Sequence, residues 1–273
     1  MYYVFNKTCI GYSHLKSKTP CQDFSATYKD NERIIITCCD GHGGPQYIRS
    51  QQGSKAASDA VVSVFKSLKS SFLHETETSN VIEKIKLMIL CEYNKLIERA
   101  ITDKPIKKME LTNLSEDEAD YIRFNQAKAY GTTLSGAMVL KNKLVVVSIG
   151  DTETLGVRKG ELIKIFDNSE DPAGNITYSM CQEDAYRYLR VAIKQVNEFD
   201  GIILCTDGLS SPYQSYENFN DSFIKPTVRR IINSNSLDNV AEHIEQIAAK
   251  LGGGDDVSLS LILNKKTNVK FYR

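Results

Sequence analysis

Runs of apolar residues alternate with amphipathic segments along this chain, which predicts a protein built from both strands and helices. Residues 34–39 are almost continuously apolar, as is typical of a strand buried on both faces. Apolar positions recur at spacings of three and four residues over 56–68 and over about Val81–Ile101, and each pattern predicts a helix. The same spacing predicts two further helices, over about Asp221–Asn233 and Leu237–Leu251.

Further strands are predicted between and after these helices. Four short strand-like runs follow one another at Thr132–Leu140, Leu144–Ile149, Thr154–Arg158 and Leu162–Phe166. The segments that join them are too short for a crossover helix, so we expect an antiparallel meander. Arg190–Gln195 and Gly201–Thr206 are expected to form another hairpin, and Val257–Leu263 a final strand.

Two segments lack such periodicity. Residues 102–130 are polar and are expected to form a solvated excursion, with a short helix that starts at Ser115–Glu118 in capping-box spacing. Residues 167–188 contain Pro172 and Gly174 and are expected to form a flap. The chain shows no internal repeat or linker, so we expect residues 1–273 to form a single domain.

The charge balance and cysteine content of the chain limit the classes of function that are expected. Lys and Arg together number 34, as do Asp and Glu, so the net charge is zero and gives no reason to expect nucleic acid or a membrane as partner. The N-terminus lacks a signal-peptide pattern, and no apolar run approaches the roughly 18 residues of a spanning helix. The seven cysteines lack CxxC spacing and are expected to pack as free thiols. These features predict a cytoplasmic protein.

Aspartates stand at the ends of several predicted strands. RIIITCCDG reaches Asp40, LVVVSIGD reaches Asp151, GIILCTDG reaches Asp207, and GGGDDVSLSLIL begins a strand at Asp255–Asp256. Because antiparallel neighbours bring the end of one strand beside the start of the next, these carboxylates can gather on one rim. Uncompensated carboxylates that lie close raise one another's pKa, so such a cluster implies bound cations. Oxygen ligands alone suit Mg²⁺ or Mn²⁺ and disfavour a zinc site.

Six motifs resemble, in order, those of the metal-dependent protein phosphatases, or type 2C serine/threonine phosphatases, and specifically their bacterial-type members. The motifs are PCQDF (Pro20–Phe24), CDGHGG (Cys39–Gly44), GTTLSGAMV (Gly131–Val139), SIGDT (Ser148–Thr152), CTDGL (Cys205–Leu209) and GGDDVSL (Gly253–Leu259). The resemblance implies an α+β fold, a four-layer α-β-β-α sandwich in which helices flank two central antiparallel β-sheets. It also implies two Mg²⁺ or Mn²⁺ ions in a cleft at one rim, and a third, weaker ion in many members.

The resemblance also assigns metal ligands to this chain. They are Asp23, Asp40, Gly41, Asp151, Asp207 and Asp255. Asp40 would bridge both ions, Gly41 would offer its carbonyl to one of them, and Asp207 and Asp255 would hold the other. Asp151 matches the ligand of the third ion. Asp256 stands where the family often has Asn, so it is a candidate to support the ligands rather than to bind an ion.

In the chemistry that the resemblance implies, two ions share a water, lower its pKa and direct it at phosphorus, without a phosphoenzyme. His42 resembles the proposed general acid, and the ordinary histidine pKa of about 6.5 suits that task. Gln22 replaces a glutamate of the better-known eukaryotic members, so we expect a weaker or water-mediated metal contact there. The family's phosphate-binding arginine is absent from GYSHLKSKTPCQD. His14 is the best substitute, with Lys16 or Lys18 as alternatives, and none offers arginine's bidentate fork.

The favoured function is therefore hydrolysis of phosphoserine and phosphothreonine in proteins, by a monomer that acts on the substrates of a serine/threonine kinase or on the kinase itself. Two alternatives stay open: a catalytically silent phosphatase-like binding module, and a phosphoesterase of small molecules. Retention of Asp40, Asp207 and Asp255 favours an enzyme over the silent module. Tyr213 and Tyr216 follow CTDGLSSP, and a contact of these side chains with substrate is left open.

Overall fold

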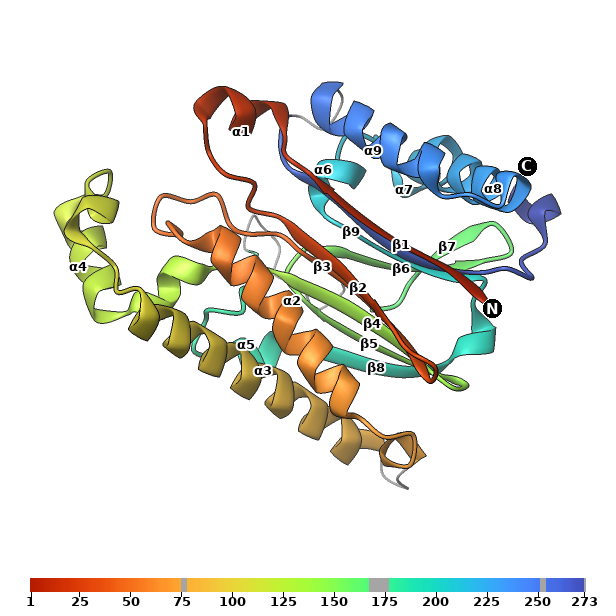
Figure 1. Ribbon diagram of the computed structural model, residues 1–273, viewed down its shortest axis with the longest axis horizontal. Coiled ribbons are helices and arrows are strands. Elements are labelled where there is room, and N and C mark those ends of the chain that lie inside the picture. The colour runs from red at the N-terminus through yellow and green to blue at the C-terminus, as the bar shows by residue number, and fades with distance from the viewer. Residues whose placement is uncertain (75–77, 167–176, 251–253, 273) are drawn as a thin grey trace.

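Two five-stranded antiparallel β-sheets lie face to face at the centre of the protein (Figure 1). The computed structural model describes residues 1–74, 78–166, 177–250 and 254–272. One sheet has the strand order β1-β10-β9-β6-β7, and the other has the order β2-β3-β4-β5-β8. The strands are β1 (Tyr2–Cys9), β2 (Phe24–Lys29), β3 (Arg33–Cys39), β4 (Leu134–Leu140), β5 (Lys143–Ile149), β6 (Glu153–Arg158), β7 (Glu161–Lys164), β8 (Arg190–Gln195), β9 (Gly201–Cys205) and β10 (Val257–Asn264).

Helices cover the outer face of each sheet (Figure 1). The α-helices are α1 (Tyr12–Ser17), α2 (Ser50–Ser67), α3 (Thr78–Asp103), α4 (Glu116–Phe124), α5 (Ala185–Tyr188), α6 (Asp207–Ser210), α7 (Tyr216–Phe219), α8 (Lys225–Ser234) and α9 (Asp238–Lys250). Helices α2 and α3 pack on the β2–β8 sheet, and α8 and α9 pack on the β1–β7 sheet. The predicted four-layer α-β-β-α sandwich is confirmed.

The alternation of side chains along β3 shows how the sequence specifies these layers. Successive residues of a strand point to opposite faces, so a strand that is apolar throughout can be buried on both sides. Ile35 packs in the cluster beneath α2 and α3, whereas Ile34 and Ile36 pack in the cluster between the two sheets. The continuous apolar run therefore reflects a central strand that has one layer on each face.

The predicted four-stranded meander is wrong in its middle connection. Strands β4 and β5 pair, and β6 and β7 pair, but β5 and β6 belong to different sheets. The chain crosses between the sheets at Gly150 and Asp151, and Gly150 adopts a φ of 89° there. A short link excludes a crossover helix, but it can lead either to a neighbouring strand or to a strand of the facing sheet.

The predicted hairpin of the next two strands is also wrong. Strand β8 pairs with β5, whereas β9 pairs with β10 and β6 in the other sheet. A 3₁₀ turn at Val196–Glu198 carries the chain across. As at Asp151, the sequence indicates a turn without specifying the sheet to which the chain returns.

Most predicted helices are confirmed. A short π-helical turn, Asn220–Ile224, precedes α8 inside the predicted span 221–233. The capping box of α4 is present, because Ser115 Oγ accepts from the Glu118 amide and Glu118 Oε2 accepts from the Ser115 amide, at 3.3 and 2.9 Å. None of the helices in the described ranges is both long and apolar enough to span a membrane.

Several elements of the structure were not predicted, and part of the predicted flap lies outside the described residues. Strands β1 and β2 and helix α1 were not anticipated from the sequence. Residues 167–176 of the predicted flap lie outside the described residues, and the remainder, 177–188, contains α5.

Candidate metal centre

Asp40 directly follows β3, and its main chain is held by Thr132 and Thr133, which lie just before β4. Its amide donates to Thr133 Oγ1 at 2.9 Å, and its carbonyl accepts from the Thr133 amide and from Thr132 Oγ1, each at 2.8 Å. The next residue, Gly41, forms a β-bridge with Thr132. A Cβ on Gly41 would lie 2.5 Å from the Gln22 carbonyl oxygen, so only glycine fits at this position.

Four other carboxylates surround Asp40. Burial raises the pKa of Asp40, and the charges of Asp23, Asp207, Asp151 and Asp255 raise it further. Burial likewise raises the pKa of Asp207, and Asp151 and Asp255 add to that shift, whereas a hydrogen bond with Asp40 opposes it. The predicted gathering of these side chains at one rim is therefore present in the structure.

No lysine or arginine forms an ion pair with this cluster within the described part of the chain. The ion pairs there include no lysine or arginine partner for Asp23, Asp40, Asp151, Asp207 or Asp255. Carboxylates in such surroundings are costly unless a cation compensates them. The donor set therefore fits hard divalent cations.

Asp23 is the most enclosed carboxylate of the cluster, with 6% of its surface exposed. Thr206 Oγ1 donates a hydrogen bond to Asp23 Oδ2 at 2.8 Å. Burial raises the pKa of Asp23 well above its ordinary value, while hydrogen bonds from Thr206 and Ser258 oppose the shift. Hydroxyl groups of Thr206, after β9, and Ser258, in β10, thus hold Asp23, which is more buried than the other carboxylates of this cluster.

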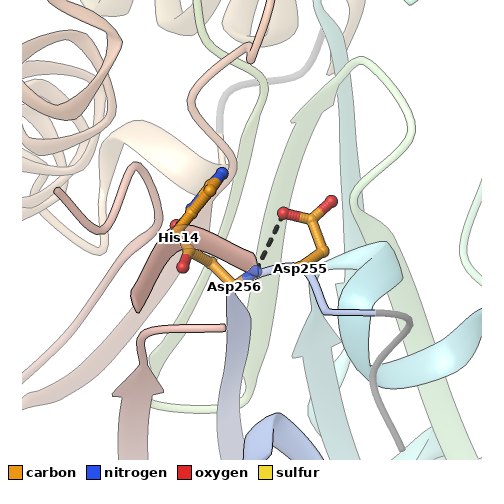
Figure 2. A group of neighbouring side chains, drawn as sticks. All are labelled: His14, Asp255 and Asp256. Atoms are coloured by element: carbon orange, nitrogen blue, oxygen red, sulfur yellow. Dashed lines mark hydrogen bonds and ion pairs between the residues drawn. The ribbon is translucent and has the colours of Figure 1, made fainter. Parts of the chain in front are cut away.

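His14, Asp255 and Asp256 form a compact group beside the cluster (Figure 2). Their ligand-type atoms all lie within 4.8 Å of one another, which makes this the one such group of three found among the described residues. Asp255 is exposed, and its Oδ1 accepts from the Asp256 amide at 2.8 Å. The carboxylate oxygens of Asp23, Asp40, Asp151, Asp207 and Asp255, taken together, therefore lie farther apart than the ligand atoms of this compact group.

Asp256 connects three parts of the N-terminal segment to this group. It is 2% exposed and accepts hydrogen bonds from the Gly11 amide at 2.8 Å and the Gln22 amide at 2.6 Å. The Nδ1 atom of His14 lies 2.9 Å from Asp256 Oδ2, but the two atoms are not aligned for a hydrogen bond, and Nδ1 is buried without a hydrogen-bond partner among the described residues. Both carboxylate oxygens are therefore engaged by protein groups, which agrees with a supporting role and not with that of a ligand.

The Gln22 side chain also supports the site from within the protein. Its Nε2 donates to Ser50 Oγ at 2.6 Å and to the His42 carbonyl at 3.3 Å. Both of these bonds use the side-chain amide nitrogen of Gln22. The amide ties the glycine-rich loop to the start of α2.

His42 lies in the loop between β3 and α2. Its amide donates to the Gly131 carbonyl at 3.1 Å, and its ring packs against Tyr47 with centroids 4.8 Å apart. Burial lowers the pKa of His42, and the nearby charge of Asp151 opposes that shift. The Nε2 atom is buried and has no hydrogen-bond partner among the residues the structure describes.

The remaining predicted residues lie at the edge of the site. Asp151 is exposed, and Thr177 Oγ1 donates to its Oδ2 at 2.7 Å. Lys16 and Lys18 are exposed on and just after α1. Tyr213 packs against the ring of Phe219, which indicates a role in the core.

Sequence reasoning missed the hydroxyl groups that hold the main chain of Asp40 and the carboxylate of Asp23. They are Thr132, Thr133, Thr206 and Ser258, and each lies inside one of the motifs quoted above. Hydroxyl residues inside the aspartate-containing and neighbouring motifs are a usable signal, because buried polar groups need hydrogen-bond partners. Thr177 has no such motif and could not have been found in that way.

The chain matches a known protein family. The sequence profile of the protein phosphatase 2C family matches residues 10–247. A comparison with curated proteins gives no match. The family profile therefore covers most of the chain, including the carboxylates from Asp23 to Asp207.

Solved structures share the fold at low sequence identity. A bacterial serine phosphatase is 17% identical with a TM-score of 0.62, and the match covers 98% of this chain and 100% of that one. Stp1, a serine/threonine phosphatase from Staphylococcus aureus, is 18% identical with a TM-score of 0.60, covering 96% and 95%. The catalytic domain of the serine/threonine phosphatase PstP, in complex with two manganese ions, is 17% identical with a TM-score of 0.56, covering 96% and 97%.

Proposed function

Because the chain belongs to the protein phosphatase 2C family, a family of phosphoprotein phosphatases, we propose that it hydrolyses phosphoserine and phosphothreonine at a centre of two divalent cations. The observation that carries this proposal is the group of carboxylates around Asp40, with which no lysine or arginine in the described ranges forms an ion pair. Such a cluster is costly for the protein alone and favourable with cations present.

The proposed cofactors are two Mg²⁺ or Mn²⁺ ions, with a third, weaker ion beside Asp151. Asp40, Gly41, Asp207 and Asp255 would hold the pair, and Asp23 would support it from its buried position. When bound, the ions supply an acidified water as the nucleophile and neutralise phosphate charge. The manganese ions of PstP, which shares the fold, are consistent with this assignment.

Two histidines have proposed roles in the reaction. His14, whose Nδ1 atom lies 2.9 Å from Asp256, would donate a hydrogen bond to a phosphate oxygen. His42 would give a proton to the seryl or threonyl oxygen as its bond to phosphorus breaks, while water adds to phosphorus. Lys16 would supply a further positive charge near the incoming phosphate.

We further propose one phosphatase domain over 1–273 that acts as a cytoplasmic monomer on phosphoproteins, such as the substrates of a serine/threonine kinase. All seven cysteines are unpaired, which suits a reducing compartment. The balanced charge of the chain supports a protein substrate over nucleic acid.

The test is initial-rate hydrolysis of a phosphothreonine peptide with Mn²⁺, Mg²⁺ or excess chelator, alongside a phosphotyrosine peptide. We expect metal-dependent phosphate release from phosphothreonine and little from phosphotyrosine. Asp40→Asn should abolish turnover with the fold retained. Asp59→Asn is the matched control, because Asp59 is an exposed carboxylate on α2 that pairs with Lys55.

Three other outcomes would contradict the proposal. Metal binding without any turnover would support the silent binding module. Activity on nucleotide or sugar phosphates alone would support a small-molecule phosphoesterase. Full activity of Asp40→Asn would remove the metal centre from the mechanism.

A further inference from the structure

Helix α1 is held in place by polar contacts instead of side-chain burial. None of its residues is buried. The amide of Ser13 donates to the Gly254 carbonyl at 2.8 Å, and the Gly11 amide donates to Asp256 at 2.8 Å. A Cβ on Gly11 would lie 2.2 Å from the Asp255 carbonyl group, so the two segments touch closely. A helix this short is unstable alone, and α1 therefore depends on the loop that carries Asp255.

Two large apolar side chains of α1 are exposed to solvent. Tyr12 is 59% exposed and Leu15 is 57% exposed. Positions three residues apart lie on the same side of a helix, so the two side chains are neighbours on the surface. Neighbouring exposed apolar groups beside a functional site mark a contact surface more often than isolated ones do.

The sequence of α1 and its flanks is basic, which suits an anionic partner, and the acidic residues that lie against it are Asp255, a proposed metal ligand, and the buried Asp256. Residues 9–22 contain His14, Lys16 and Lys18 and no acidic residue, although the whole chain has a net charge of zero. Both lysines are exposed. A phosphorylated peptide segment carries about two negative charges at its phosphate, so it complements this segment.

The position of α1 places this surface beside the proposed reaction centre. Figure 1 shows α1 beyond the ends of β1 and β10, and His14 on α1 reaches back to Asp256 at 2.9 Å. An extended peptide spans about 3.3 Å per residue and a helix is about 10 Å across. A peptide whose phosphate contacts His14 therefore needs about three or four residues to cross α1.

We propose that Tyr12 and Leu15 dock the polypeptide that flanks the phosphorylated residue, and that the enzyme favours phosphopeptides with a large apolar side chain about three residues from that site. This inference rests on the proposed function, since it takes the phosphopeptide as the occupant of the site. It adds a preference in the substrate that the metal centre itself does not provide.

The test measures binding of non-hydrolysable phosphonate analogues of a phosphothreonine peptide to the Mn²⁺-loaded protein by fluorescence anisotropy. One set of peptides has leucine about three residues to either side, and the reference has serine at both positions. The wild type should bind one leucine peptide about tenfold more tightly than the reference. Tyr12→Ser with Leu15→Ser should lose that preference, whereas Leu87→Ser, at an exposed leucine of α3, should keep it.

Hydrolysis of p-nitrophenyl phosphate separates this inference from the proposed function. The double variant should hydrolyse this small substrate with unchanged KM, because it has no flanking polypeptide. Equal affinity of the wild type for all the peptides, or an equal loss on the small substrate, would overturn the docking role. A concentration-dependent dimer that the double variant loses would assign the surface to a second copy instead. Absence of all turnover with an intact leucine preference would reject the phosphatase proposal alone.

Discussion

The Nδ1 atom of His14 lies 2.9 Å from Oδ2 of Asp256, and the Asp256 side chain is 2% exposed. The contact is one of proximity, because Nδ1 makes no hydrogen bond with a described residue, and a small rotation of the ring would be needed to align its N–H with the carboxylate. Figure 2 shows a ring nitrogen of His14 and the carboxyl group of Asp255 projecting to the same side. The pair thus places the proposed phosphate-binding residue beside a proposed metal ligand.

Replacement of His14 tests its contact with phosphate. His14→Ala should raise KM for a phosphothreonine peptide about tenfold or more and lower kcat less, because a binding contact is lost. Steady-state kinetics measures both constants. His14→Arg should recover a low KM, since arginine offers two parallel donors to phosphate. An unchanged KM in His14→Ala would contradict the role.

Replacement of Asp256 tests its position as an anchor. Asp256→Ala leaves the Gly11 and Gln22 amides without their acceptor and should lower the free energy of unfolding by about 2–4 kcal/mol. Denaturant unfolding gives this value. In protein that remains folded, the imidazole ¹⁵N resonances of His14 should shift as it loses its carboxylate partner. Unchanged resonances would show that Asp256 does not orient the ring.

The role of His42 is tested by varying the leaving group. His42→Gln should lower kcat for a phosphothreonine peptide by about 10²–10⁴, because the alkoxide then leaves without a proton. Hydrolysis of p-nitrophenyl phosphate should be nearly unaffected, since that leaving group is stable as an anion. Comparison of the two substrates in one assay separates proton donation from damage to the site. Equal losses on both would exclude the general-acid role.

Removal of metal should leave the site strained by its own charges. Burial and neighbouring carboxylates raise the pKa of Asp40, so the charged form is unfavourable in the metal-free protein. In excess chelator, Asp40→Asn should therefore raise the free energy of unfolding by about 1–2 kcal/mol. Calorimetry should show that Mn²⁺ raises the Tm of the wild type much more than that of the variant. A metal-free variant less stable than the wild type would contradict this account.

The raised pKa values also set a pH dependence. Asp23, Asp40 and Asp207 bind more protons in the folded state than in the unfolded state, so this contribution makes stability fall as pH rises. The fall begins near the ordinary Asp pKa of about 3.9 and is complete above the raised values. The Mn²⁺-induced increase in Tm should hence be larger at about pH 7.5 than at about pH 5.5, because protons compete with the ion.

Arg49 gives a prediction for stability away from the carboxylates. Its guanidinium is buried and donates to both carboxylate oxygens of Glu110 at 3.0 Å. The hydrogen bonds from Arg49 lower the pKa of Glu110, so the pair stabilises the fold above the ordinary Glu pKa of about 4.3 and loses that effect as pH falls below it. Glu110→Gln should cost about 1–3 kcal/mol at neutral pH and little in acid. Denaturant unfolding at both pH values checks this, and an equal cost in acid would contradict it.

The layers of the fold could be predicted from sequence, but its connections could not. Apolar spacing identified α2, α3, α8 and α9, because each buries one face against a sheet. The same patterns could not show that the chain changes sheets at Asp151, since burial is the same whichever sheet a strand joins. Strand β1 was missed because most of its residues are only half-buried and its pattern is weak.

The site was predictable at the charged residues and less so at the groups that hold them. Asp40 and Asp207 stand out because a charge ends a buried strand. The roles of Asp256 and Gln22 were harder to predict. They depend on a contact between these two residues, which are more than 200 positions apart in the sequence. The family resemblance gave the ligand set, while the structure gave the supporting hydrogen bonds.

The pairing of β1 with β10 affects how the protein forms during synthesis. Tyr2 to Cys9 pair with Asn264 to Val257, so β1 has no partner strand until β10 has been synthesised. Contacts this distant in sequence form late and slow the folding rate. Asp255 emerges from the ribosome just before β10, so an incomplete chain has neither its closed sheet nor its full set of carboxylates.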